Sequence, residues 1–201
     1  MPLFDLVRAD DPEMAYLLRQ AELSTEAWIH LIASESDISR AVWQAQQSVL
    51  ARKYSEGYPG GRYYAGNEIA DLIEQLGIDR AKELFETPHA NLQPHSGAIA
   101  NMAIYLASMK PGEVVMGLKL EDGGHLSHGA EASHTGNLFT PVSYGLDENH
   151  RVDVAEVRRL AEEHRPKLIF AGYSAYSRIV PWEELGKIAD DVGAYLVADI
   201  S

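Results

Sequence analysis

Small polar residues and glycine occupy residues 93–101, Gln-Pro-His-Ser-Gly-Ala-Ile-Ala-Asn, which lead into an apolar, alanine-rich run. This composition predicts that a short strand over residues 90–92 turns into a helix at Ser96 and Gly97. Backbone N–H groups at a helix start and the positive end of the helix dipole attract anions, and a Ser-Gly pair permits close approach. The stretch therefore indicates a phosphate-binding turn. The alternative is that Ser96 is only an N-cap, a position that serine favours.

Three further polar residues follow apolar runs that are typical of buried strands: His125, Ser174 and Asp199. In parallel sheets, ligands bind beyond the carboxyl ends of the strands, so we expect these residues to converge with the Ser-Gly turn at one edge. Asp199 could pair with a ring cation there, or it could cap a following helix. Convergence on one edge favours a binding site.

His125 lies in a glycine-rich stretch, residues 123–129, with further histidines and Glu131 nearby. Such a cluster could bind a metal ion, but the glycines disfavour a regular helix and the H-E-x-x-H spacing is absent. A flat imidazole on this loop could instead stack on a planar cofactor. We favour stacking and expect no metal site.

Residues 54–68 contain four tyrosines, four glycines and a proline. Gly and Pro permit tight turns, and the tyrosines supply rigid hydroxyl groups. Glu56 and Arg62 lie among them, which indicates a structured loop that contributes to a site, one that could lie across a subunit boundary. The alternative is a surface loop whose tyrosines pack on the core.

Apolar spacing predicts the remaining elements. Helices are expected over residues 12–30, 39–50, 68–85, 98–109, 153–164 and 182–191, and strands over residues 113–117, 138–144, 167–171 and 194–199. Continuous apolar strands that alternate with helices indicate a mainly parallel α/β sheet covered on both faces. A G-x-G-x-x-G dinucleotide fingerprint is absent.

The amino-acid composition limits which kinds of molecule the protein could bind and where it could be located. Among 201 residues, 17 basic and 30 acidic side chains give a formal charge of −13, which argues against nucleic acid or an anionic membrane as a partner. There is no cysteine, and the first residues mix charged with apolar side chains, unlike a signal peptide. We expect a cytoplasmic protein.

The sequence closely resembles the serine hydroxymethyltransferase family from residue 31 to the last residue. The resemblance rests on five long runs in the same order and on Asp199: residues 31–35, 54–64, 93–97, 123–129 and 174–177. It implies an α/β fold of the fold-type I pyridoxal-phosphate transferase class, which is aspartate-aminotransferase-like, with a mainly parallel seven-stranded sheet in the large domain. Residues 1–80 would form a helical arm and a Tyr/Gly-rich dimer loop, and residues 81–201 the first part of the cofactor-binding large domain.

The family implies pyridoxal 5′-phosphate as cofactor and tetrahydrofolate as cosubstrate in the reversible conversion of serine to glycine. Ser96, Gly97 and Tyr54 would lie at the cofactor phosphate and His125 would stack on the ring. Ser174 would bond the O3′ side, and Asp199 would face the pyridine nitrogen.

The family also implies substrate contacts. In a homodimer or dimer of dimers, Tyr54, Glu56 and Tyr64 would reach the neighbouring site, with Glu56 as the proton relay; Glu56, Tyr64 and His125 are the expected catalytic residues. Ser34 would bind the amino-acid carboxylate. The expected folate-pocket residues are Leu120, Gly124 and Leu126.

Departures from the family pattern keep alternatives open. They are Ser36, the pair Ala98 and Ile99 after the turn, and the pair Ile200 and Ser201. A folate-independent aldolase or transaldolase for threonine-like substrates, an α-methylserine hydroxymethyltransferase and a noncatalytic paralogue are the competing functions. The family's Schiff-base lysine would follow Ser201, so we expect an amino-terminal fragment that is inactive alone.

Overall fold

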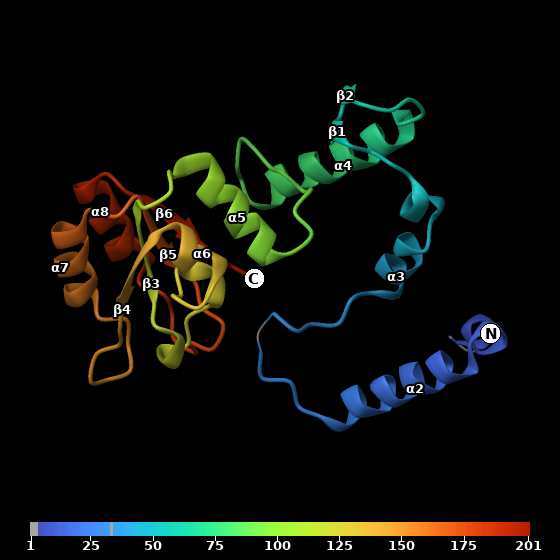
Figure 1. Ribbon diagram of the computed structural model, residues 1–201, viewed down its shortest axis with the longest axis horizontal. Coiled ribbons are helices and arrows are strands. Elements are labelled where there is room, and N and C mark those ends of the chain that lie inside the picture. Colours follow the sequence, from blue (N-terminus) through green and yellow to red (C-terminus); the bar gives the residue numbers. More distant parts are fainter. Residues whose placement is uncertain (1–3, 33) are drawn as a thin grey trace. The chain divides into compact units, whose positions relative to one another are not determined.

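The computed structural model describes residues 4–32 and 34–201, so residues 1–3 of the expected arm and Ala33 of the first matched run lie outside the described residues. The chain divides into two compact units, Met1–Glu35 and Ser36–Ser201. The first unit contains α1 (Asp5–Asp10) and α2 (Pro12–Ala27) (Figure 1). Asp11 caps α2 by accepting a hydrogen bond from Met14 N at 2.9 Å, and Pro12 occupies the first helical position, where a missing N–H costs nothing.

The second unit is built on a four-stranded sheet of order β4-β3-β5-β6. The strands are β3 (Val114–Leu118), β4 (Thr140–Tyr144), β5 (Leu168–Ala171) and β6 (Tyr195–Ala198), and every pairing is parallel. The prediction of a parallel α/β sheet is therefore confirmed. The central strands β3 and β5 are continuous apolar runs because both of their faces are buried.

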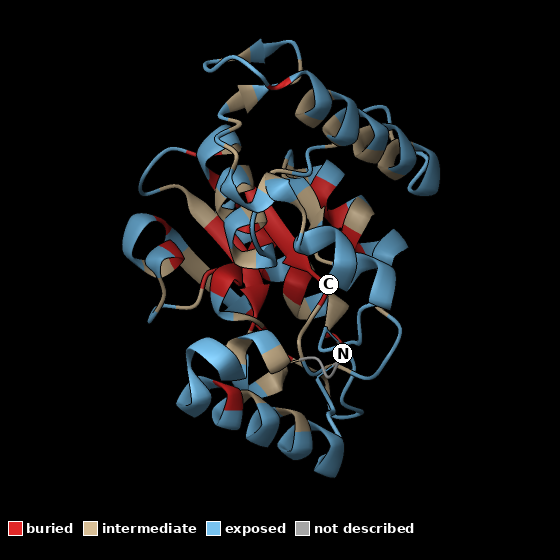
Figure 2. Cartoon of the chain, turned by 90° about the vertical axis from the view of Figure 1, so that its right-hand side faces the viewer, coloured by how far each residue is buried: buried red, intermediate tan, exposed pale blue. Residues whose placement is uncertain are grey.

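Helices cover both faces of this sheet. On one face, α7 (Val154–His164) and α8 (Trp182–Val192) bury a cluster that includes Val157, Leu185 and Ile188. On the other face, α5 (Gly97–Ser108) packs Tyr105 against Phe139 and Phe170, with ring centroids 5.0 and 5.1 Å apart. Figure 2 shows the buried residues gathered on the strands and on the helix faces that meet them.

The segment before the sheet contains α3 (Arg40–Gln46), a 3-10 turn η1 (Val49–Arg52), the hairpin strands β1 (Gly57–Tyr58) and β2 (Gly61–Arg62), and α4 (Glu68–Leu84). The expected helix over residues 39–50 is thus shorter, ending at Gln46. The expected structured loop contains a tight antiparallel hairpin. In residues 4–32 and 34–201 no helix is long and apolar enough to cross a membrane.

Two local expectations were wrong. Residues 90–92 form no strand. The side chain of Asn91 bonds to the backbone that follows, since its Oδ1 accepts the N–H of Gln93 at 3.0 Å, and Pro94 has no N–H that could pair with a neighbouring strand. The strand expected over residues 138–144 is present but begins at Thr140, because Leu138 ends a short helix, α6 (His134–Leu138), which Ser133 caps through Thr135 N.

Candidate functional site

Polar residues meet at the carboxyl edge of the parallel sheet. Asp199 follows β6, Ser174 follows β5, and His125 lies beyond β3 between two 3-10 turns, η2 (Leu120–Asp122) and η3 (Leu126–His128). Ser174 N–H donates to Gly123 O at 3.0 Å, which joins two of these loops. A Cβ placed on Gly97, the first residue of α5, would lie 3.3 Å from Ser201 Oγ, so the helix start reaches the same edge.

Ser96 caps α5. Its Oγ accepts the N–H of Ile99 at 3.3 Å, as the cap alternative requires. The backbone N–H groups in the first turn of this 12-residue helix have no acceptor within the helix. Capping and anion binding are compatible, because the cap satisfies only one of those donors.

The carboxylate of Asp199 is held by three neighbours. Oδ2 accepts hydrogen bonds from Asn101 Nδ2 at 3.0 Å and His128 Nε2 at 2.8 Å, and Oδ1 accepts from the Ser201 hydroxyl at 2.7 Å. Burial by itself would raise the pKa of Asp199, but the hydrogen bonds from Ser201, Asn101 and His128 outweigh it and hold the pKa well below the ordinary value. Asp199 is therefore a fixed anion at neutral pH.

His128 is neutral in this arrangement. Its side chain is 1% exposed and stacks on Phe170 with centroids 4.8 Å apart. Burial lowers the pKa of His128, and this effect exceeds the opposing influence of Asp199. A carboxylate only accepts, so the proton of neutral His128 lies on Nε2, and Nδ1 is a buried acceptor without a hydrogen-bond partner in the described residues.

The position of Asp199 depends on a glycine in the neighbouring loop. Gly172, directly after β5, has a φ of +103°, and a Cβ there would lie 1.8 Å from Asp199 O. Asp199 N–H donates to Ala171 O at 2.7 Å, which keeps the two backbones in contact. Only glycine fits both the conformation and the approach.

A second set of expected residues lies on the segment with the β1–β2 hairpin, which Figure 1 shows beside α4. Tyr54 and Tyr64 pack edge to face with centroids 6.2 Å apart, and both are exposed, as is Glu56. In the part of the chain that the structure describes, no hydrogen bond or ion pair links these three residues to His125, Ser174 or Asp199.

The buried side chain of Arg62 holds the hairpin to α4 through hydrogen bonds. Its side chain is 5% exposed and donates to Asp71 Oδ1 at 2.7 Å, to Glu74 Oε2 at 2.6 Å, and to the carbonyls of Ser55 and Gly57 at 2.6 and 2.7 Å. Hydrogen bonds from Gly60 N–H and Arg62 lower the pKa of Asp71. The guanidinium thus joins the hairpin backbone to α4.

Gln93 extends that linkage to the helix start. Its Nε2 donates to Gly57 O at 2.9 Å and to Glu74 Oε1 at 2.8 Å, three residues before Ser96. The hairpin and the phosphate-binding candidate are therefore connected through one side chain.

The remaining expected residues are dispersed. Ser34 is exposed in a turn of the first unit. Gly124 is buried, whereas Leu120 and Leu126 are exposed on the segment that carries His125. Among the described residues, no three His, Cys, Asp or Glu side chains form a group that could hold a metal ion.

Sequence reasoning missed Asn101, His128 and the internal role of Arg62. Asn101 lies at the end of the stretch 93–101, five residues after Ser96, and His128 lies three residues after His125. Their spacing was visible, but only tertiary structure shows that both contact Asp199.

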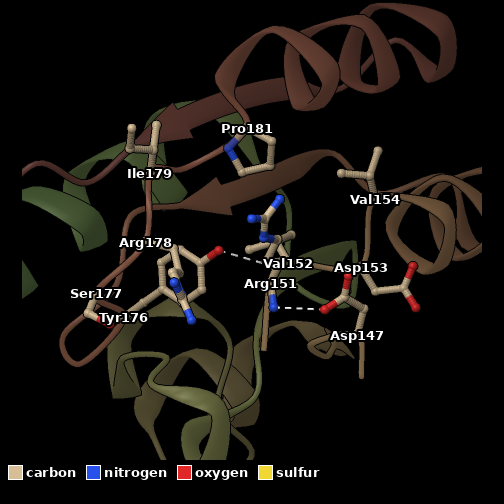
Figure 3. A pocket seen from close by; sticks show the side chains of 10 residues that line it. All are labelled: Asp147, Arg151, Val152, Asp153, Val154, Tyr176, Ser177, Arg178, Ile179 and Pro181. Atoms are coloured by element: carbon tan, nitrogen blue, oxygen red, sulfur yellow. Dashed lines mark hydrogen bonds between the residues drawn. The ribbon is translucent and has the colours of Figure 1, made fainter. Parts of the chain in front are cut away.

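A separate surface pocket of about 680 Å³ lies between residues 147–154 and 176–181 (Figure 3). Tyr176 crosses it and accepts the N–H of Val152 at 3.2 Å. Two guanidinium groups, of Arg151 and Arg178, also line it, and none of the expected site residues does.

The sheet edge fits a phosphorylated pyridine. A helix start offers N–H donors to an anion, a flat imidazole lies on the adjacent loop, and a carboxylate of lowered pKa can hold a ring N–H. A parallel α/β domain with this edge defines the class of fold-type I pyridoxal-phosphate domains.

The family follows from comparison with known proteins. A family model described as serine hydroxymethyltransferase matches residues 7–201. The chain is 51% identical over 191 residues to serine hydroxymethyltransferase of Halorhodospira halophila (strain DSM 244 / SL1), covering 95% of this chain and 46% of that protein. It is 53% identical over 192 residues to the protein of that name from Acinetobacter radioresistens, with the same coverage. The chain belongs to the serine hydroxymethyltransferase family, and it spans about half the length of these curated relatives.

Proposed function

We propose that the protein carrying this chain interconverts serine and glycine with pyridoxal phosphate as cofactor and tetrahydrofolate as the one-carbon acceptor. One observation carries the proposal. In a chain that matches the family model, the ionised carboxylate of Asp199 lies at the sheet edge, and the start of α5 reaches the same edge. When bound, pyridoxal phosphate supplies an electron-accepting ring that stabilises negative charge at the substrate's α-carbon.

The chain's own residues have distinct roles in this proposal. The first turn of α5, with Ser96 and Gly97, binds the phosphate group. His125 covers the ring, Ser174 bonds its O3′ side, and Asp199 retains the proton on the ring nitrogen. Because Asp199 stays ionised, that proton remains in place at neutral pH.

The substrate contacts require a second copy of the chain. Tyr54, Glu56 and Tyr64 are exposed on a rigid segment, which supports the proposal that they complete the neighbouring protomer's site, with Tyr54 near the phosphate and Glu56 moving a proton at the substrate hydroxyl. Ser34 binds the substrate carboxylate. The folate pocket is assigned to Leu120, Gly124 and Leu126.

The division of the chain follows the same scheme. Residues 1–80 serve the contact between subunits, and residues 81–201 form the first part of the cofactor-binding domain. In a homodimer, each site would then combine residues 81–201 of one protomer with residues 54–64 of its partner.

The test uses the full-length protein. Added pyridoxal phosphate should produce a visible absorbance band that changes with serine, and glycine should form only when tetrahydrofolate is present. Asp199→Ala should abolish glycine formation, whereas Asp190→Ala, an exposed aspartate on α8, should not. A band with folate-independent cleavage would favour an aldolase instead, and no band would contradict the proposal.

Mixing variants tests the shared site. Glu56→Gln and Asp199→Ala should each be inactive alone, but hybrid dimers contain one site with both residues intact. A refolded equimolar mixture should therefore recover about a quarter of the wild-type activity if dimers form at random. No recovery would place Glu56 in the site of its own protomer.

A further inference from the structure

Asn101 lies at the centre of the polar network beneath the sheet edge. It is 5% exposed on α5, and its Nδ2 donates to two acceptors: Asp199 Oδ2 at 3.0 Å and Ser127 Oγ at 2.9 Å. One amide nitrogen therefore uses both of its N–H groups on different elements. Neither contact lies within α5, so the side chain serves the site rather than its own helix.

The hydrogen-bond partners fix the orientation of the amide. An ionised carboxylate only accepts, so the nitrogen of Asn101 faces Asp199. Ser127 Oγ accepts the second N–H and is left to donate its own proton to His125 Nδ1, 2.7 Å away. Ser127 N–H also donates to that ring nitrogen at 3.1 Å, so Nδ1 is the acceptor and Nε2 is the ring nitrogen that carries a proton.

We propose that Asn101 is a positioning residue: it holds the Asp199 carboxylate in place for the cofactor's ring nitrogen and connects it through Ser127 to His125. This inference rests on the proposed function. An amide suits the role because it donates two hydrogen bonds without neutralising the carboxylate. A cation in its place would compete with the ring N–H for the negative charge, and a second carboxylate would repel Asp199.

The experiment compares two cofactors on the full-length apoprotein. Pyridoxal phosphate carries the ring nitrogen, and 1-deazapyridoxal phosphate has carbon there, so only the first can interact with Asp199 through a ring N–H. Equilibrium dissociation constants are measured for both by titration. Asn101→Ala should weaken binding of pyridoxal phosphate about tenfold and binding of the deaza analogue less than about twofold, since a hydrogen bond to a charged group is lost.

Two variants serve as controls. Ile104→Ala removes a partly buried side chain of α5 that packs on the core, so it should change both dissociation constants by the same factor. Ser127→Ala removes the connection to His125 but leaves the contact between Asn101 and Asp199, so it should also leave the ratio of the two constants unchanged.

The outcomes separate this inference from the proposed function. If Asn101→Ala weakens the binding of both cofactors by the same factor, the positioning role is overturned. The proposed function would still stand in that case, because the wild type binds pyridoxal phosphate. A wild type that binds neither cofactor would refute the proposed function itself. If Asn101→Ala does not fold, Asn101→Ser keeps a short polar side chain, and the same change in ratio is required of it.

Discussion

The sheet edge and the hairpin segment differ in how they use polar side chains. At the sheet edge, Asp199, Asn101 and His128 direct their polar groups at one another. In the hairpin segment, the side chain of Arg62 is buried and bonds to Asp71, while Glu56 and Tyr54 face solvent. One region is thus a cluster of polar side chains that bond to one another, and the other is a hydrogen-bonded hairpin that presents side chains to solvent.

The helix next to the hairpin, α4, also presents side chains to solvent that a helix would normally bury. The first half of α4 exposes a stripe of large apolar side chains at helical spacing: Ile69, Leu72, Ile73 and Leu76. A soluble helix normally buries such a stripe. Its exposure supports the proposed contact between subunits, whereas α7 and α8 turn their apolar faces into the core.

The largest expected effect is at the sheet edge. Gly172→Val places a Cβ where Asp199 O now lies and forces a branched residue into a left-handed conformation. We expect a loss of about 3 kcal/mol or more in unfolding free energy and loss of pyridoxal phosphate binding. Chemical denaturation and cofactor titration of the full-length protein measure both.

Gly193→Ala is the matched control for Gly172→Val. Gly193 also has a positive φ, +72°, but a Cβ there would meet nothing within 4 Å. We expect a cost of about 1 kcal/mol from backbone strain and unchanged cofactor affinity. Similar effects of the two substitutions would show that strain, and not the contact with Asp199, accounts for the loss at Gly172.

The second prediction concerns the hairpin alone. Arg62→Leu removes four hydrogen bonds and leaves Asp71 and Glu74 without their cation. Amide hydrogen exchange over residues 55–63 should become at least about tenfold faster, because this segment is opened locally. Exchange in β5 and β6 should stay unchanged.

Arg158→Leu provides the comparison for Arg62. Arg158 pairs with Asp191 at 2.8 Å, but its side chain is 42% exposed, and such surface pairs contribute little. Its loss should leave exchange unaltered throughout. Unchanged protection of residues 55–63 in Arg62→Leu would mean that β1–β2 pairing, rather than the guanidinium, holds the hairpin.

The sequence predicts features that depend on local pattern, but not those that depend on contacts between distant residues. Buried strands such as β3 and β5 follow from continuous apolar runs, and the helix start at Ser96 follows from a capping residue. Arg62 looked like a site residue because sequence does not reveal burial, and Asn101 looked like part of a helix because its partner Asp199 is 98 residues away. The apolar pattern of residues 90–92 does not reveal that the Asn91 side chain bonds to the following backbone N–H of Gln93.

The smallest effect concerns pH and the buried His128, which faces Asp199 and His125 and stacks on Phe170. Its pKa is lowered on folding, so below the unfolded value of about 6.5 the unfolded chain binds more protons than the folded protein. His128 therefore lowers the unfolding free energy as pH falls from about 6.5 towards the folded pKa, and this loss is absent above about 6.5.

His128→Gln keeps an N–H donor for Asp199 but does not titrate, so the slope of unfolding free energy between pH 5 and 7 should be smaller than in the wild type. His89→Gln, an exposed control, should keep the wild-type slope. A slope unchanged by His128→Gln would mean that folding does not shift the pKa of His128, and a larger slope would mean that His128 is charged in the folded protein and forms an ion pair with Asp199.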